Sequence, residues 1–152
     1  MSLMIALHTL AAVIWVGGMF FAYTALRPAA AKTLEPSQRA LLWCRALSLF
    51  FRWVWGSIVV LLVTGYGLIG ALGGMANVGW HVHAMQALGL LMMLLFLHIY
   101  FAPYRRLKLA IEAEDTPEAS RRVGQIRMFV AINLILGLIV VIIGSGGRYI
   151  AI

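Results

Sequence analysis

The sequence predicts an all-α integral membrane protein, a bundle of four spanning helices. Of its 152 residues, 63% are hydrophobic and only 11% are charged, and the mean hydropathy is +0.96. Soluble domains usually carry about 25% charged residues. Four apolar stretches each approach the roughly 20 residues that a helix needs to cross a bilayer. The lipid bilayer is therefore the expected surroundings of most of the chain, and an ordinary soluble domain is excluded.

The four apolar stretches form one transmembrane domain in which polar segments separate the spans. The first stretch ends at "RPAAAK" and the third at "APYRR", and the second runs into the glycine-rich segment "GALGGMANVG". A segment beginning "PSQRALLWCRALSLFFRW" has the pattern of an amphipathic helix on the inner surface ahead of the second span. We expect the spans at about residues 3–26, 47–72, 81–102 and 129–147.

The basic residues predict how the chain is oriented. Eleven of the twelve Lys and Arg residues lie in two long connections, at about residues 27–46 and 103–128, or at the edges of the adjoining spans; Arg148 is the exception. Cytoplasmic connections of membrane proteins carry an excess of Lys and Arg. We therefore expect both connections in the cytoplasm and both termini on the periplasmic side of a bacterial inner membrane. The same rule explains the net charge of +7, so no nucleic-acid partner is expected.

The histidines are the candidate functional residues. An ionisable residue inside a membrane is costly and usually functional, and the expected spans hold no Asp, Glu or Lys. His8 lies twenty residues before Pro28, and His83 lies twenty residues before Pro103. This weak internal repeat suggests two related helical hairpins. Because both spans run from outside to inside, His8 and His83 are expected at the same depth near the outer face.

Two histidines at one depth favour a haem site. The iron of a b-type haem is held by imidazoles from facing helices of a bundle, so we expect His8 and His83 as axial ligands of haem b. The glycine-rich ends of the second and fourth spans would leave space for the ring. Other residues are expected to contact the haem, to pair with a propionate or to orient an imidazole, and these are Trp15, Arg148, Tyr66 and Gln86.

Copper is the alternative at the start of the third span. His81, His83 and Met85 combine imidazole with thioether, which suits Cu(I). Residues two apart on a helix point to different sides, so His81 is expected at the interface if His83 faces the bundle. A third interpretation is an assembly subunit without a cofactor, whose histidines are interfacial polar residues. Nearer the inner face, we expect a hydrogen bond between His98 and Asn133.

The chain also resembles known membrane families. "LHTLAAVIWVGGMFF", "VTGYGLIG" and "RMFVAINLILGL" are similar to CopD-type proteins, the copper resistance protein D family. The His-then-Trp first helix and the "GW" before a His are similar to HemJ-type protoporphyrinogen oxidases. Met85 stands where the HemJ pattern has a Lys. The second resemblance implies haem b at His8 and His83 and, with it, porphyrin oxidation.

These observations define two main functional expectations. The first is a haem-binding protein of the inner membrane that acts in electron transfer or redox chemistry, with a partner such as a quinone or another membrane protein. If it is an enzyme, it is a haem-dependent oxidoreductase. The second expectation is a copper-handling or copper-transport protein of CopD type. A homodimer is possible because four helices alone do not fully bury a haem.

Overall fold

The computed structural model is all-helical over residues 1–149, the part of the chain that it describes. Within these residues it contains four helical rods that are long and apolar enough to cross a membrane, which confirms the predicted fold class. The elements in chain order are α1 (Ser2–Phe21), the π-helical η1 (Ala22–Leu26), α2 (Arg27–Thr33), α3 (Pro36–Ala71), the short η2 (Met75–Asn77), α4 (Trp80–Phe101), α5 (Pro103–Glu112), α6 (Thr116–Gly146) and the short η3 (Gly147–Tyr149).

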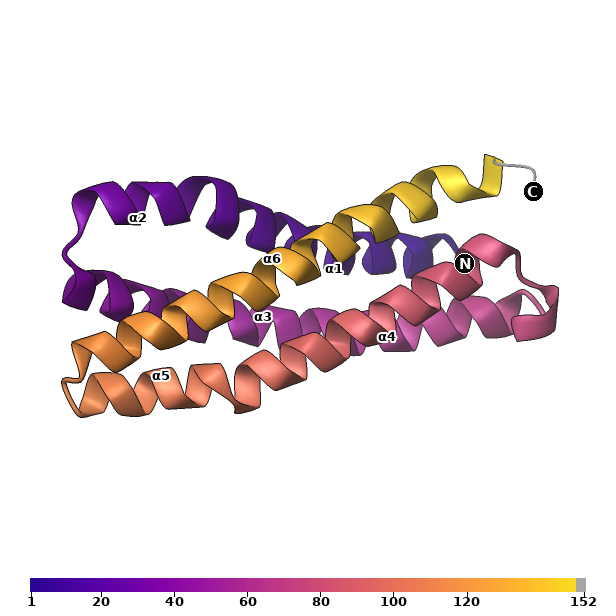
Figure 1. Cartoon of the computed structure of the whole chain (residues 1–152). Coiled ribbons are helices and arrows are strands. Elements are labelled where there is room, and N and C mark those ends of the chain that lie inside the picture. Colours follow the sequence, from indigo (N-terminus) through magenta and orange to yellow (C-terminus); the bar gives the residue numbers. More distant parts are fainter. Residues whose placement is uncertain (150–152) are drawn as a thin grey trace.

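The rods form two helical hairpins of the same plan. In each hairpin, one helix bends near a proline, continues as a shorter helix, and is followed by a long antiparallel helix (Figure 1). The first hairpin is α1, α2 and α3, and the second is α4, α5 and α6. Helix α1 packs mainly against α3, and α6 packs mainly against α4 and α5. The weak repeat in the sequence therefore corresponds to a repeated structural unit.

Proline explains both bends. Its ring blocks the α-helical hydrogen bond to the carbonyl four residues earlier and crowds that carbonyl. Before Pro28 the helix widens into the π-helical turn η1, which absorbs this conflict without ending the rod. Before Pro103, Ala102 leaves the helical region with φ −109° and ψ −88°, and α5 starts again at the proline. The first rod is thus bent, whereas the second is interrupted.

The two long connections, at residues 27–46 and 103–128, are mainly helical. Only Leu34 and Glu35 separate α2 from α3, and α3 is one continuous helix of 36 residues. No separate surface helix therefore precedes the second span. At the start of α6, the Asp115 carboxylate accepts a hydrogen bond from the backbone N–H of Glu118 at 3.0 Å, so Asp115 caps this helix.

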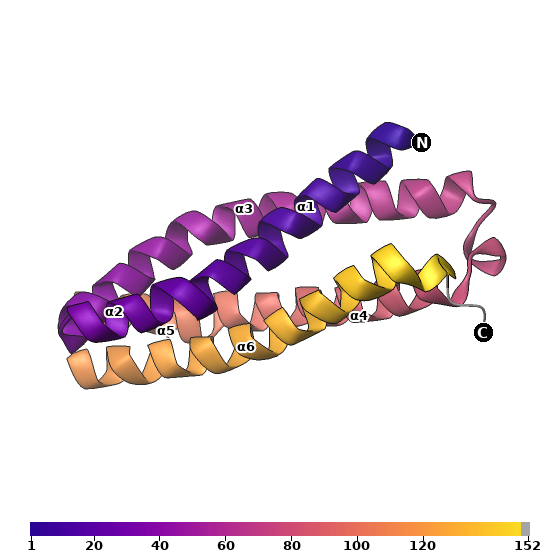
Figure 2. The same ribbon diagram turned by 90° about the horizontal axis from the view of Figure 1, so that it is seen from above.

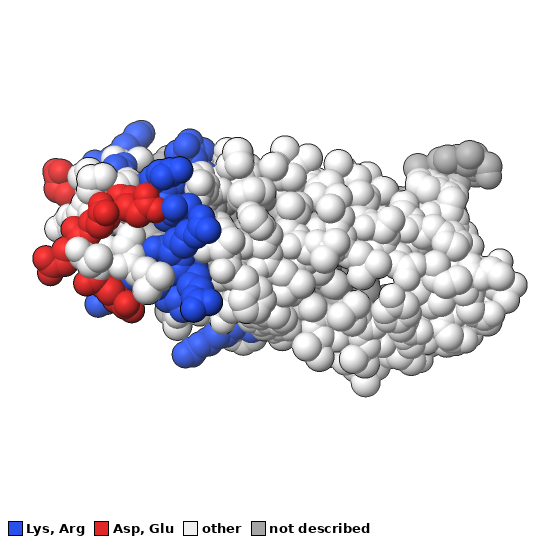
Figure 3. All heavy atoms as spheres, turned by 60° about the horizontal axis from the view of Figure 1, so that its bottom comes forward, with Lys and Arg blue, Asp and Glu red and all other residues white. Residues whose placement is uncertain are grey.

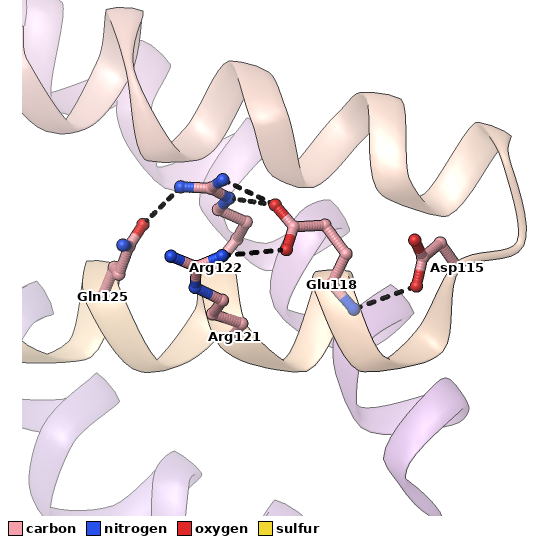
Figure 4. Close-up of polar contacts among 5 residues, drawn as sticks. All are labelled: Asp115, Glu118, Arg121, Arg122 and Gln125. Carbon is pink, nitrogen blue, oxygen red and sulfur yellow. Dashed lines mark hydrogen bonds and ion pairs between the residues drawn. The ribbon is translucent and has the colours of Figure 1, made fainter.

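The first turns of α6 also carry an ion-pair network (Figure 4). Glu118 pairs with Arg122 at 2.6 Å and with Arg121 at 3.6 Å, and Arg122 donates a further hydrogen bond to Gln125. Residues three and four apart are neighbours on the surface of a helix, so these side chains can pair. A carboxylate in the first turn also interacts favourably with the helix dipole. This polar end of α6 is therefore stable as helix outside the apolar part of the bundle.

Charge divides the bundle into two ends. The described Lys, Arg, Asp and Glu side chains gather at one end, with the basic residues next to the uncharged surface and most acidic residues beyond them (Figure 3). We call this the basic end; it contains α2, α5 and the connections to α3 and α6. The opposite end holds the N-terminus, the α3–α4 connection and three of the histidines, and we call it the histidine end.

The core lies toward the basic end. Phe51 and Phe96 are buried, and edge-to-face ring contacts join them to Trp15 and Tyr104. Within the four rods, residues of α1 before Ala11 and of α4 before Met92 include none that are buried. The α1–α3 and α4–α6 pairs diverge toward the histidine end (Figure 2). Aromatic packing therefore holds the hairpins together at one end and leaves the other more open.

Candidate metal site at the histidine end

His8 is held in a defined orientation by helix α3. Its Nδ1 lies 2.8 Å from the Thr64 hydroxyl oxygen, and that hydroxyl donates its proton to the Val60 carbonyl at 2.6 Å. A hydroxyl has a single proton, so the Thr64 oxygen accepts the bond from the N–H of His8. The other ring nitrogen, Nε2, then carries a free lone pair. A histidine fixed through Nδ1 in this way is suited to bind a metal through Nε2.

Met4 lies one helical turn before His8 and faces the same helix. A Cβ atom built on Gly67 would lie 3.0 Å from the Met4 sulfur, and one built on Gly65 would lie 3.3 Å from Cε1 of His8. Two glycines of α3 thus provide the space for both side chains. Residues four apart share one helix face, so a thioether and an imidazole stand side by side here. Met4 is not among the residues expected from the sequence, although its spacing of four from His8 is a usable signal.

A second pair of the same chemistry lies on α4. The Met85 sulfur would be 3.0 Å from a Cβ atom on Gly144, and the His81 Cβ would be 2.7 Å from one on Gly147. His81 and Met85 are again four residues apart, and the Met85 sulfur faces α6. The His81 ring turns back toward Gly79, where a Cβ atom would lie 2.8 Å from its Cε1. Each hairpin therefore carries one imidazole and one thioether four residues apart, and in each hairpin the thioether lies against a glycine of the long helix.

The structure reverses the expected orientations of His81 and His83. His81 is half-buried against the end of α6, whereas the side chain of His83 is exposed. The reason is that α4 packs against α6, and residue 83 lies on a different side of α4 from the 81 and 85 positions. The proposed ligand roles of these histidines remain predictions.

Two other expected site residues contact each other. The Gln86 amide donates a hydrogen bond to the Tyr66 hydroxyl at 3.2 Å, which links α3 to α4 near the histidine end. Among the described hydrogen bonds, none joins either residue to a histidine. Trp15 is buried and packs edge-on against Phe96 at 6.2 Å between ring centroids, inside the aromatic core. The side chain of Arg148 lies outside the described residues.

The expected bond between His98 and Asn133 is wrong. His98 is exposed, and its ring packs against Phe129 at 4.8 Å between centroids. Asn133 instead donates to the Met92 carbonyl at 3.4 Å, and its Oδ1 atom has no hydrogen-bond partner. Met92, Phe96 and Ile99 form the face of α4 that enters the core, and His98 lies beside that face.

The two Met–His pairs at the histidine end contain no carboxylate or thiolate donor. Among residues 1–149, no group of three or more His, Cys, Asp and Glu side chains could hold a metal ion. The two Met–His pairs instead offer thioether sulfur and imidazole nitrogen. This donor set fits Cu(I), which prefers soft ligands, and does not fit Mg²⁺ or Ca²⁺, which require oxygen.

The fold and this end of the bundle define the class of the protein: it is a multi-pass α-helical membrane protein. Residues 44–146 match the family described as Copper resistance protein D, CopD. This match covers more than half of the chain, so the chain belongs to the CopD family, as "VTGYGLIG" and "RMFVAINLILGL" predicted. No curated protein and no solved structure matches the chain. Similarity to HemJ-type proteins stays a prediction.

Proposed function

We propose that this protein handles copper, binding Cu(I) at the histidine end through Met4 and His8 on α1 and through His81 and Met85 on α4. One observation carries the proposal: the same pair of donors, an imidazole and a thioether four residues apart, occurs once in each hairpin, with its thioether against a glycine of the long helix. Membership of the copper resistance family supports it.

The chemistry of the two pairs suits transient binding of copper. Side chains four residues apart on a helix have Cβ atoms about 5–6 Å apart, so both can reach one ion between them. Neutral ligands leave the positive charge of Cu(I) uncompensated. Such a site holds the ion weakly enough to release it, as passage through a membrane requires. Copper is therefore the cargo of the protein in this proposal.

The location follows from the charge distribution. We propose that the protein lies in a bacterial inner membrane with its basic end in the cytoplasm, because Lys and Arg are retained on that side. The histidine end and both Met–His pairs would then face the periplasm.

The test is copper binding by the purified protein, measured as Cu(I) stoichiometry against a colorimetric Cu(I) chelator. X-ray absorption of the bound copper should show both sulfur and nitrogen neighbours. Replacing His8 and His81 with Ala, and Met4 and Met85 with Leu, should abolish binding. His98→Ala is the matched control, because it removes a histidine elsewhere on α4. Full copper binding by the fourfold variant, or equal loss in the control, would refute the proposal.

Haem b is a second candidate, and the geometry of His8 favours it. An axial histidine usually binds the iron through Nε2 while its Nδ1–H donates a hydrogen bond, and the bond to Thr64 leaves Nε2 of His8 available in this way. His83 would supply the second ligand, and the protein would serve electron transfer with a quinone or another membrane protein. A Soret band after expression with added haem, lost in His8→Ala, would support this function. A colourless protein that binds copper would leave only the first proposal.

A further inference from the structure

A pocket lies apart from the histidine end, in the half of the bundle nearer the basic end. It has a volume of about 340 Å³ and lies among α1, α2, α3 and α6, with α4 at its floor. The volume is in the range of pockets that hold small molecules, about 300–1,000 Å³. None of the residues that line it belongs to either Met–His pair. It therefore needs an explanation of its own, independent of copper or haem.

The pocket has a cationic side without a counter-ion. Arg27, Arg39 and Arg127 line it, and no Asp or Glu does. Within residues 1–149, the ion pairs involve other arginines, Arg121 and Arg122. Arg27 lies over the Tyr23 ring at 4.9 Å, which orients its guanidinium but does not neutralise it. Three unneutralised guanidinium groups beside a cavity are suited to bind a carboxylate or a phosphate.

The deep part of the pocket contains an unsatisfied hydrogen-bond acceptor. Asn133 lines the pocket and is only 1% exposed. Its Nδ2 donates a hydrogen bond to the Met92 carbonyl, while its Oδ1 has no hydrogen-bond partner. A buried carbonyl oxygen without a partner is costly and rare in native structures. The missing partner must be a donor, that is, a hydroxyl or an N–H group.

Aromatic rings form the walls between these two polar features. Trp15, Phe50 and Phe96 all line the pocket, and Trp15 packs edge-on against Phe96. Aromatic walls favour a planar ring, which stacks or packs edge-on against them. Arg127 and Asn133 are six residues apart on α6, a rise of about 9 Å. The occupant should therefore carry its two polar groups about two fused rings apart.

We propose that this pocket binds an anionic amphiphile with a planar aromatic body. Its carboxylate or phosphate pairs with the arginines, and a hydroxyl or N–H at its opposite end donates to Oδ1 of Asn133.

The probe for this proposal is 6-hydroxy-2-naphthoate, a fluorescent planar acid with its hydroxyl and carboxylate at opposite ends. Binding is measured by titration of the full-length protein in zwitterionic nanodiscs. We expect saturable binding that weakens about tenfold in Arg39→Gln, since a charged hydrogen bond is lost. Arg105→Gln is the matched control, because Arg105 is exposed at the same end but does not line the pocket. Equal weakening in both variants would show only a general charge effect and overturn the proposal.

The role of Asn133 is tested by changing the ligand. 2-Naphthoate, which lacks the hydroxyl, should bind the unaltered protein about fivefold more weakly, as expected for one lost hydrogen bond. In Asn133→Leu the two acids should bind equally. If the unaltered protein already binds them equally, the assigned donor–acceptor contact is wrong, whatever the variant does.

An anionic phospholipid is another source of the same chemistry. Nanodiscs that contain phosphatidylglycerol should lower the affinity of the hydroxynaphthoate less than twofold if a small acid is the occupant. Displacement by phosphatidylglycerol that depends on Arg39 would assign the pocket to lipid phosphate and overturn the proposed occupant.

Discussion

The imidazole of His8 and the hydroxyl of Thr64 lie 2.8 Å apart, and this contact joins α1 to α3 at the edge of the buried core. Thr64 is the last buried residue of α3 before the histidine end. The threonine also bonds the carbonyl of Val60, so it has no second proton and acts as the acceptor. Helix α3 therefore determines which ring nitrogen of His8 is free: Nδ1 is hydrogen-bonded, and Nε2 is available to a ligand.

Removing that acceptor tests the orientation of His8. Thr64→Val keeps the shape of the side chain but removes the hydroxyl. We expect Cu(I) affinity to fall by about tenfold or more, the usual effect of losing a hydrogen bond that orients a metal ligand. Competition with a Cu(I) chelator measures it. Thr24→Val is the control, because Thr24 is exposed and bonds only its own helix. Unchanged affinity in Thr64→Val would exclude the role of this contact.

A larger side chain at Gly67 of α3 tests the position of Met4. A Cβ atom on Gly67 would already be 3.0 Å from the Met4 sulfur, whereas one on Gly70 would meet nothing within 4 Å. Gly67→Leu should therefore displace the thioether and lower copper stoichiometry, and Gly70→Leu should not. Both changes add the same side chain to the same helix, so their difference isolates the site. Equal copper content in the two variants would argue against Met4 as a ligand.

Because Oδ1 of Asn133 has no hydrogen-bond partner, we expect that replacing this amide stabilises the protein. Asn133→Leu replaces a buried amide with a side chain of similar volume and eliminates the unsatisfied acceptor. Among residues 1–149, its weak 3.4 Å bond to the Met92 carbonyl is the one side-chain hydrogen bond lost. We expect the ligand-free protein to become more stable, by about 1 kcal/mol. Thermal unfolding in detergent measures this, and a marked loss of stability would show that Oδ1 has a partner such as a bound water.

The orientation in the membrane predicts the behaviour of fusion proteins. With the basic end in the cytoplasm, a C-terminal alkaline phosphatase fusion should be active and a C-terminal green fluorescent protein fusion dark. Replacing Arg105, Arg106 and Lys108 with Gln should weaken this orientation, because these residues supply the inside charge after α4. A fluorescent C-terminal fusion of the unaltered chain would place the Met–His pairs on the cytoplasmic side instead.

The sequence by itself determined the class of the protein. Apolar stretches of spanning length, the separation of charge along the chain and the repeat around Pro28 and Pro103 predicted a membrane bundle of two hairpins. These properties are local or compositional, so they do not depend on which helices pack together. His8 was also found in this way, because an intramembrane histidine is unusual wherever it points.

The tertiary structure decided which side chains share a face with a neighbouring helix. Apolar residues occur on all sides of α4, so its pattern gave no indication that Met85 faces α6 while His83 is exposed. In a membrane the lipid-facing and protein-facing sides of a helix are both apolar, which removes the polar stripe that marks the outer face of a soluble helix. The partner of Asn133 and the place of Met4 against Gly67 likewise depend on helix packing, which only the folded chain specifies.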